Sequence, residues 1–251
     1  ESADYFEIDS SLLSEMIAKS VIIGAAADDR RTHIIGVYAE RIVENDKKIF
    51  RLVSTDGSRL SKVDFVFDPS VDFSAIPGVL IPKKSLVEVG KFLEIEGNIR
   101  FAFKDNNFII KKDSETLIIR LLDGEFPKYS DIIIKPSGHK LIMDRQMFLM
   151  MLKRMSILSS EEYKGVIFNF DENQLTISST NPEIGESKED MPIEFKGKKI
   201  TVMFNPKFFI DTLNVIDDDK VSLYIVNEEK PCLIEGEKDN SYLSVIMPMR
   251  L

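Results

Sequence analysis

The chain has 251 residues, of which 43% are hydrophobic and 30% are charged, a composition typical of a globular protein with one large or two smaller domains. Its formal net charge is −9, whereas proteins that hold nucleic acid by neutralising phosphates are usually basic. This binding mode is therefore disfavoured, and any role on DNA is expected to be weak, local or topological.

Neither secretion nor membrane insertion is indicated. No apolar run reaches the roughly 18 residues that a membrane helix needs. The opening residues "ESADYFEIDSS" have neither the basic nor the apolar part of a signal peptide. They also lack an initiator Met, so we expect a processed product or a fragment. The single cysteine, Cys232, excludes an intrachain disulfide and favours the cytoplasm.

Four segments have apolar residues at the spacing of a helix. Pro82 suits the first turn of the second segment, and Asp144 and Asn205 suit the N-caps of the third and fourth. In the first segment, the residues expected on one apolar face are Leu12, Leu13, Met16 and Ile17. The four predicted helices are 10–22, 82–95, 144–158 and 205–216. Alternating apolar and polar residues predict strands at 99–103, 166–170, 174–178, 220–226 and 242–247.

The predicted elements occur twice in the same order. "FEIDSSLLSEMIAKS" matches "LIMDRQMFLMMLKRM", which aligns Asp9 with Asp144, and "IIGVYAE" matches "YKGVIFN" through Gly36 and Gly165. Three further pairs follow in order, and a Pro/Gly linker signal, "KPSG", lies between the copies. The sequence therefore predicts an α+β fold with two copies of one domain, 1–135 and 136–251, each with antiparallel sheets packed on two helices.

The sequence lacks the residue patterns of common catalytic and metal sites. The two histidines, His33 and His139, are far apart, and neither a phosphate-binding glycine loop nor a cysteine cluster occurs. The acidic triplet at 217–219 could bind a divalent cation, but we interpret it as a solvated turn. No catalytic residue, metal site or cofactor is therefore expected.

Four motifs carry a resemblance to a known family: "TDGSRL" at 55–60, "LLDGEFPKY" at 121–129, "ILSSEEYKGV" at 157–166 and "MPMRL" at 247–251. Through them the whole chain resembles the bacterial β sliding clamp, the processivity subunit of the DNA polymerase III holoenzyme. The resemblance implies two DNA-clamp domains, the family's second and third, with the first absent from this chain. It also implies a bacterial, nucleoid-associated protein that encircles duplex DNA as a head-to-tail dimer and has no catalysis of its own.

In that family, partner proteins insert a short apolar peptide into a groove between the last two domains. The partners implied are the replicative polymerase, the clamp loader, translesion polymerases, mismatch-repair proteins and ligase. Adaptable methionines suit such a groove, although alternation equally places Val245 in a core strand. Asp131, Phe208 and Pro231 depart from residues common in the family, so the peptide preference is expected to differ. The implied groove residues are Ile34, Gly36, Thr55, Gly57, Ser58, Arg59, Leu60, Pro127, Ile132, Asn205, Phe208, Val245, Met247, Pro248, Met249, Arg250 and Leu251.

The resemblance also implies surfaces for DNA and for ring closure. Ile157 and Leu158 match the family's dimer contact, although they could instead end a buried helix. Without the first domain, the chain is expected not to close a ring and to be mainly monomeric. The competing interpretations are a truncated clamp-like peptide-binding scaffold that cannot encircle DNA, and a metal or small-molecule enzyme. The residues expected to face DNA are Lys19, Arg30, Arg31, Lys91, Lys153 and Arg154.

Overall fold

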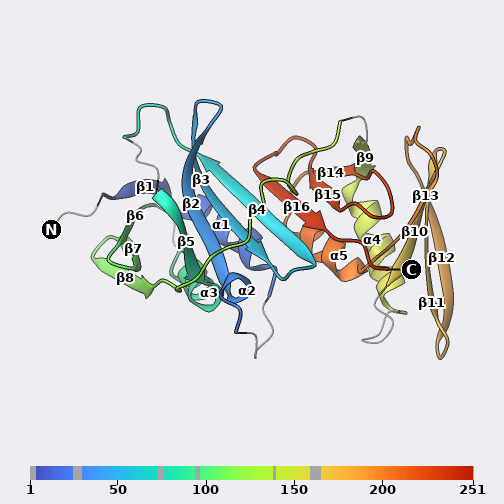
Figure 1. The fold of residues 1–251 in the computed structure, drawn as a ribbon, viewed down its shortest axis with the longest axis horizontal. Coiled ribbons are helices and arrows are strands. Elements are labelled where there is room, and N and C mark those ends of the chain that lie inside the picture. Colours follow the sequence, from blue (N-terminus) through green and yellow to red (C-terminus); the bar gives the residue numbers. More distant parts are fainter. Residues whose placement is uncertain are drawn as a thin grey trace. The chain divides into compact units, whose positions relative to one another are not determined.

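The computed structural model describes residues 4–24, 30–72, 76–93, 97–137, 140–158 and 165–250. Contacts divide the chain into two units, Glu1–Lys128 and Tyr129–Leu251 (Figure 1). The division falls before the boundary expected at residues 135 and 136. Lys135 provides a reason for the difference, because its Nζ lies 2.5 Å from the carboxylate Oε2 of Glu235. This ion pair ties the connecting segment to the second unit.

The first unit contains two sets of antiparallel strands and two long helices (Figure 1). Strands β1, β6, β7 and β8 pair in that order, and so do β5, β2, β3 and β4. Helix α1 packs on β3, β4 and α3. The bounds are β1 Phe6–Asp9, α1 Ser10–Val21, α2 Thr32–Ile35, β2 Gly36–Glu44, β3 Lys47–Thr55, β4 Arg59–Val66, β5 Ile76–Pro82, α3 Lys83–Phe92, β6 Asn98–Lys104, β7 Asn107–Lys112 and β8 Glu115–Arg120.

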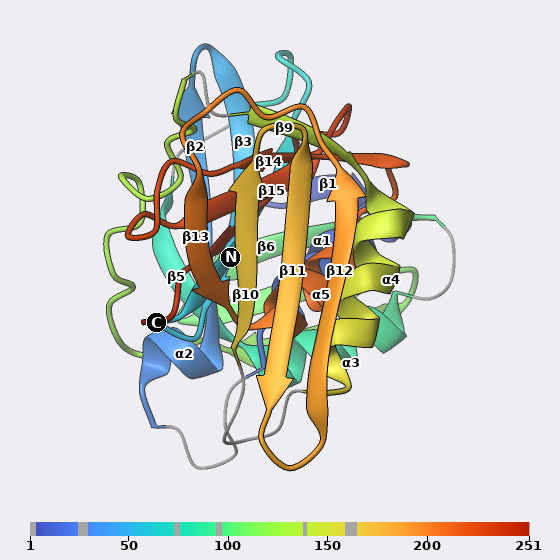
Figure 2. The same cartoon turned by 90° about the vertical axis from the view of Figure 1, so that its right-hand side faces the viewer.

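The second unit has the same arrangement. Strands β12, β11, β10 and β13 pair in that order, and so do β16, β15, β14 and β9. Figure 2 looks onto the first of these sets, beside which α4 runs along β12. The bounds are β9 Lys140–Asp144, α4 Arg145–Ser156, β10 Val166–Asp171, β11 Gln174–Asn181, β12 Gly185–Pro192, β13 Ile200–Phe204, α5 Pro206–Asn214, β14 Lys220–Tyr224, β15 Cys232–Gly236 and β16 Tyr242–Ile246.

The element order confirms the duplicated α+β fold. In the described part of each unit, a helix follows the first strand and another follows the fifth, with the one-turn α2 as the addition in the first unit. Asp9 and Asp144 cap α1 and α4, accepting hydrogen bonds from the amides of Ser11 at 2.8 Å and Met147 at 2.7 Å. Pro82 is the N-cap of α3, one position before the first turn predicted for it.

The helices bury the apolar faces that their periodicity predicts. Leu13, Met16 and Ile17 on α1 are at most 4% exposed. Leu12 differs from the prediction: it is 41% exposed, because it lies at the edge of the apolar stripe rather than at its centre. In the second unit, Phe148 on α4 packs edge-on against aromatic rings from β10 and α5. No helix in the described ranges is long and apolar enough to cross a membrane.

Candidate functional site

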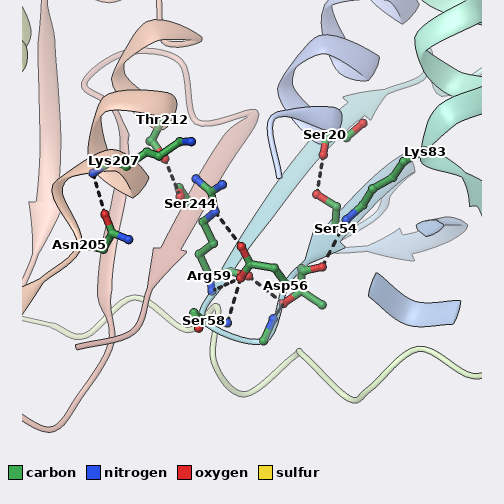
Figure 3. Close-up of polar contacts among 12 residues, drawn as sticks. Ser20, Ser54, Asp56, Ser58, Arg59, Lys83, Asn205, Lys207, Thr212 and Ser244 are labelled. Carbon is green, nitrogen blue, oxygen red and sulfur yellow. Dashed lines mark hydrogen bonds and ion pairs between the residues drawn. The ribbon is translucent and has the colours of Figure 1, made fainter. Parts of the chain in front are cut away.

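The "TDGSRL" motif forms the turn between β3 and β4 (Figure 3). The Asp56 carboxylate organises it: Oδ1 accepts hydrogen bonds from the amides of Ser58 at 2.9 Å and Arg59 at 3.0 Å, and Oδ2 accepts one from Nε of Arg59 at 3.0 Å. Gly57 has a φ of 92°, a conformation that side chains with a Cβ rarely adopt. The residue types of the motif therefore match the geometry of the turn.

Thr55 closes the same turn from the strand side. Its Oγ1 donates a hydrogen bond to the carbonyl of Arg59 at 2.7 Å and accepts one from the amide of Gly57 at 3.0 Å. Its own carbonyl accepts a hydrogen bond from Nζ of Lys83, at 3.3 Å (Figure 3). The predicted residues Arg59 and Leu60 are 8% and 3% exposed, while Gly57 and Ser58 are exposed.

A second cluster of predicted residues surrounds α2. Ile34 is buried, and Gly36 starts β2. A Cβ on Gly36 would lie 2.9 Å from the carbonyl of Thr32 and 3.2 Å from side-chain atoms of Leu80 and Leu122. A glycine is therefore required if the segment at 121–127 is to pack against α2 and β5. Pro127 lies at the end of that segment and is exposed.

The second unit holds a cavity of about 710 Å³ at the "MPMRL" segment. The amide of Met249 donates a 2.8 Å hydrogen bond to the carbonyl of Met203, which pairs the segment with β13. Met247 and Met249 are 39% and 37% exposed, so their apolar surface is available to a ligand. The lining residues are Val202, Met203, Glu228, Glu229, Met247, Pro248, Met249 and Arg250.

The other predicted groove residues of this unit lie outside that lining. Asn205 caps α5 through Lys207, and Phe208 is half-buried on the same helix. Val245 is 1% exposed and pairs with Leu233 in the sheet, as its core interpretation requires. Ile132 is 40% exposed in the segment before β9. Leu251 lies outside the described residues.

Helix α5 is attached to the strand that precedes the "MPMRL" segment. Oγ1 of Thr212 on α5 donates a hydrogen bond to Oγ of Ser244 on β16, at 2.9 Å in a buried position (Figure 3). Such a bond contributes about 1 kcal/mol when both partners are satisfied. It sets the position of α5 relative to β16, and therefore relative to the start of the segment that lines the cavity.

Half of the residues that line the cavity were not predicted from the sequence. Nothing in the spacing of Val202 and Met203 marked them as lining residues. Glu228 and Glu229 resemble an ordinary polar loop. A second cavity has a volume of about 560 Å³, and none of its lining residues was predicted to belong to a functional site. They are Lys140, Ile142, Asn173, Pro192, Ile193, Glu194, Lys220 and Glu237.

The six basic residues predicted to face DNA differ in their availability. Lys19 does not meet the expectation, because its side chain is 4% exposed and pairs with Glu15 one helical turn away. Arg154 is 52% exposed but is paired with Glu189 of β12, and the hydrogen bond from Arg154 lowers the pKa of Glu189. Lys91 is exposed and pairs with Glu88 on the same helix, at 2.9 Å. Arg30, Arg31 and Lys153 are also exposed.

The two predicted dimer residues lie at the end of α4. Ile157 is its C-cap and is 73% exposed, so it is not part of a buried helix end. Leu158 is half-buried, and its carbonyl accepts a 3.0 Å hydrogen bond from the side chain of Asn181. Ile157 is thus exposed beside a residue whose backbone is fixed by a hydrogen bond. An exposed isoleucine of this kind can contact a partner surface.

Two features bear on whether the described residues could carry out catalysis: their metal-binding groups and the Cys232 thiol. They contain no group of three His, Cys, Asp or Glu side chains arranged to hold a metal ion. The Cys232 thiol is fully buried, and burial raises its pKa, which makes it a poor nucleophile.

Known protein families match both units. The profile of the DNA polymerase III beta subunit central domain matches residues 7–128, and that of the C-terminal domain matches residues 131–250. A "Beta sliding clamp" of Chlamydia pneumoniae is 34% identical over 200 residues, covering 80% of this chain. The chain belongs to the β sliding clamp family. Its two units correspond to the central and C-terminal domains of these clamps.

Solved clamp structures share the fold over the full length of this clamp chain. The DNA polymerase III beta subunit of Thermotoga maritima has a TM-score of 0.88 and 29% identity, covering 100% of this chain and 66% of the other. That of Pseudomonas aeruginosa has a TM-score of 0.89 and 26% identity, covering 98% and 66%. The chain spans 54% of the Chlamydia pneumoniae clamp and 65% of the Pseudomonas putida clamp.

Proposed function

We propose that this chain works as part of a DNA sliding clamp, a non-catalytic protein that tethers a replicative polymerase and other DNA-processing proteins through a peptide-binding site. The observation that carries the proposal is the cavity at residues 247–250, where two partly exposed methionines belong to a segment that is hydrogen-bonded to β13. Met side chains adapt to different apolar ligands. Membership of the clamp family supports the class of ligand that we propose, short peptides of replication and repair proteins.

Direct binding measurements test the peptide site. A labelled peptide carrying a clamp-binding motif is titrated with the 251-residue chain, and fluorescence polarisation is expected to give micromolar affinity. Removal of residues 247–251 should abolish binding and leave the circular dichroism spectrum and cooperative unfolding intact. Unchanged binding after this removal would place the peptide elsewhere and overturn the assignment of the cavity.

The proposal extends to duplex DNA, held by topology with weak non-specific contacts. Support comes from the exposed lysines Lys91 on α3 and Lys153 on α4, and from Arg30 and Arg31 before α2. A clamp must slide, so strong phosphate contacts would work against it. The alternative, a clamp-like peptide scaffold with no role on DNA, is favoured by the net charge of −9 and by the burial of Lys19.

Salt dependence separates these two candidates. Linear duplex should bind weakly and lose affinity as salt rises, and Lys91→Gln with Lys153→Gln should reduce both the affinity and its salt dependence. The matched control, Lys47→Gln with Lys198→Gln, removes two exposed lysines outside the helices and should have little effect. Equal losses for both double variants would favour the scaffold. Sequence-selective tight binding would contradict sliding.

Ring closure is proposed to use Ile157 at the end of α4, against a further domain of the family's subunit. The 251-residue chain by itself is then expected to sediment as a monomer. Because Ile157 is 73% exposed, weak self-association at high concentration should be reduced by Ile157→Asp. A stable closed dimer of the 251-residue chain would be inconsistent with this assignment.

A further inference from the structure

The cavity at the "MPMRL" segment has an apolar part and a charged part. Its apolar surface comes from Val202, Met203, Met247, Pro248 and Met249. Its charged groups are the carboxylates of Glu228 and Glu229 and the guanidinium of Arg250. Two carboxylates against one guanidinium leave the lining acidic. A ligand that fits this cavity therefore needs an apolar segment and is favoured by a positive charge beside it.

The two carboxylates are held at the edge of the cavity by the loop before β15. The side-chain Oδ1 of Asn227 accepts hydrogen bonds from the amides of Glu229 at 3.0 Å and Lys230 at 2.9 Å. Glu228 and Glu229 are exposed, and within the described ranges neither carboxylate forms an ion pair. Lys230 follows them but is not part of the lining. Both carboxylates are therefore free to pair with a ligand.

We propose that Glu228 and Glu229 select partner peptides that carry lysine or arginine next to their apolar segment. The inference rests on the peptide-binding function proposed above and names the chemistry of the partner. The apolar side chains of the peptide fill the space between the methionines, and its cationic side chain lies against the two carboxylates. Specificity then comes from two sources: basic peptides gain an ion pair, and acidic peptides meet like charge across the cavity.

The expected size of the effect follows from the exposure of the carboxylates. An exposed ion pair contributes a fraction of a kcal/mol to about 1 kcal/mol, which corresponds to at most about fivefold in affinity. Repulsion of an acidic flank adds to the difference between a basic and an acidic peptide, giving about tenfold in total at low salt. The difference should shrink as salt is added, because exposed charges are screened over about 10 Å at 0.1 M ionic strength.

The test compares three versions of one clamp-binding peptide taken from a replicative polymerase. They differ only in the residues that flank the apolar segment on both sides, which are lysine, glutamine or glutamate. Calorimetric titration of the wild-type chain should rank them in that order of affinity. In the double variant Glu228→Gln with Glu229→Gln, the glutamine peptide should bind as before, and the lysine and glutamate peptides should bind almost equally.

A matched control removes the effect of total charge. Glu183→Gln with Glu186→Gln neutralises two exposed carboxylates of the β11–β12 hairpin that line neither cavity, so the ranking of the three peptides should survive. Equal affinities of the three peptides for the wild-type chain would overturn the acidic selection and leave the peptide site standing. Loss of the ranking in the control would assign it to net charge. Absence of binding by all three peptides would overturn the peptide site itself and this inference with it.

Discussion

The amide of Met249 donates a 2.8 Å hydrogen bond to the carbonyl of Met203. This single backbone contact places a segment rich in methionine alongside β13, and with it one wall of the cavity. Because the contact uses the backbone, the side chains of Met247 and Met249 remain partly exposed. They can therefore be changed with little disturbance of the fold.

Replacing both methionines by alanine should separate binding from stability. Met247→Ala with Met249→Ala is expected to weaken binding of a clamp-binding peptide at least about tenfold, as loss of central apolar anchors does. The free energy of unfolding in urea should fall by no more than about 2 kcal/mol, since both side chains are only partly buried. The control, Met147→Ala with Met150→Ala, changes two methionines of α4 that are 51% and 42% exposed and should leave peptide affinity unchanged. If the control weakened binding equally, the cavity would not be the site.

The effect of a substitution at Gly57 on stability should come from backbone conformation rather than from side-chain packing. The φ of Gly57 is 92°, and no heavy atom lies within 4 Å of the position a Cβ would take. Gly57→Ala is therefore expected to lower the free energy of unfolding by about 1–2 kcal/mol through backbone strain alone. Gly24→Ala is the control, because that position is equally open without the left-handed φ. It should be neutral or slightly stabilising. Similar losses at both positions would contradict the strain argument.

Acid stability should depend on the pair formed by Arg154 and Glu189. Nε of Arg154 donates a 2.7 Å hydrogen bond to Glu189, and this bond lowers the pKa of the carboxyl. A carboxylate whose pKa is lower in the folded state stabilises the fold above the unfolded value of about 4.3, and this contribution is lost as the pH falls through the lowered value. Arg154→Gln should therefore destabilise the protein at neutral pH, and its effect should vanish once the pH is below the lowered pKa of Glu189.

Urea unfolding at several pH values measures that dependence. Lys153→Gln removes the same charge from the neighbouring exposed position and controls for net charge. A difference between Arg154→Gln and wild type that stayed constant across the acid range would show that the ion pair does not contribute to acid stability.

The Cys232 thiol should be unreactive in the folded protein. It is completely buried in β15, and burial raises its pKa, so little thiolate exists at neutral pH. Labelling by a maleimide is expected to be at least about a hundredfold slower than in denaturant, because it requires opening of the core. Labelling by mass spectrometry with and without urea gives the ratio, and rapid labelling of the folded chain would be incompatible with the buried position.

The order of the elements and the starts of the helices could be predicted from the sequence. Capping depends on neighbouring residues, so Asp144 and Asn205 identified the first turns of α4 and α5 without knowledge of the fold. Periodicity identified the buried face of α1. It failed for Leu12, which lies at the edge of the apolar stripe and is exposed. The duplication was visible because both copies retain the same local patterns.

The sequence by itself therefore determined the duplicated α+β domain, its helices and, through its motifs, its family. Only the tertiary structure decided which side chains share a site. Glu228 and Glu229 line the same cavity as Met247 and Met249, although β15 and β16 separate the two pairs in the sequence. Lys19 is buried, although its sequence context is that of an exposed basic residue. The physical reason is range: caps and helical stripes arise within a few residues, whereas cavities and burial depend on long-range packing that no local pattern records.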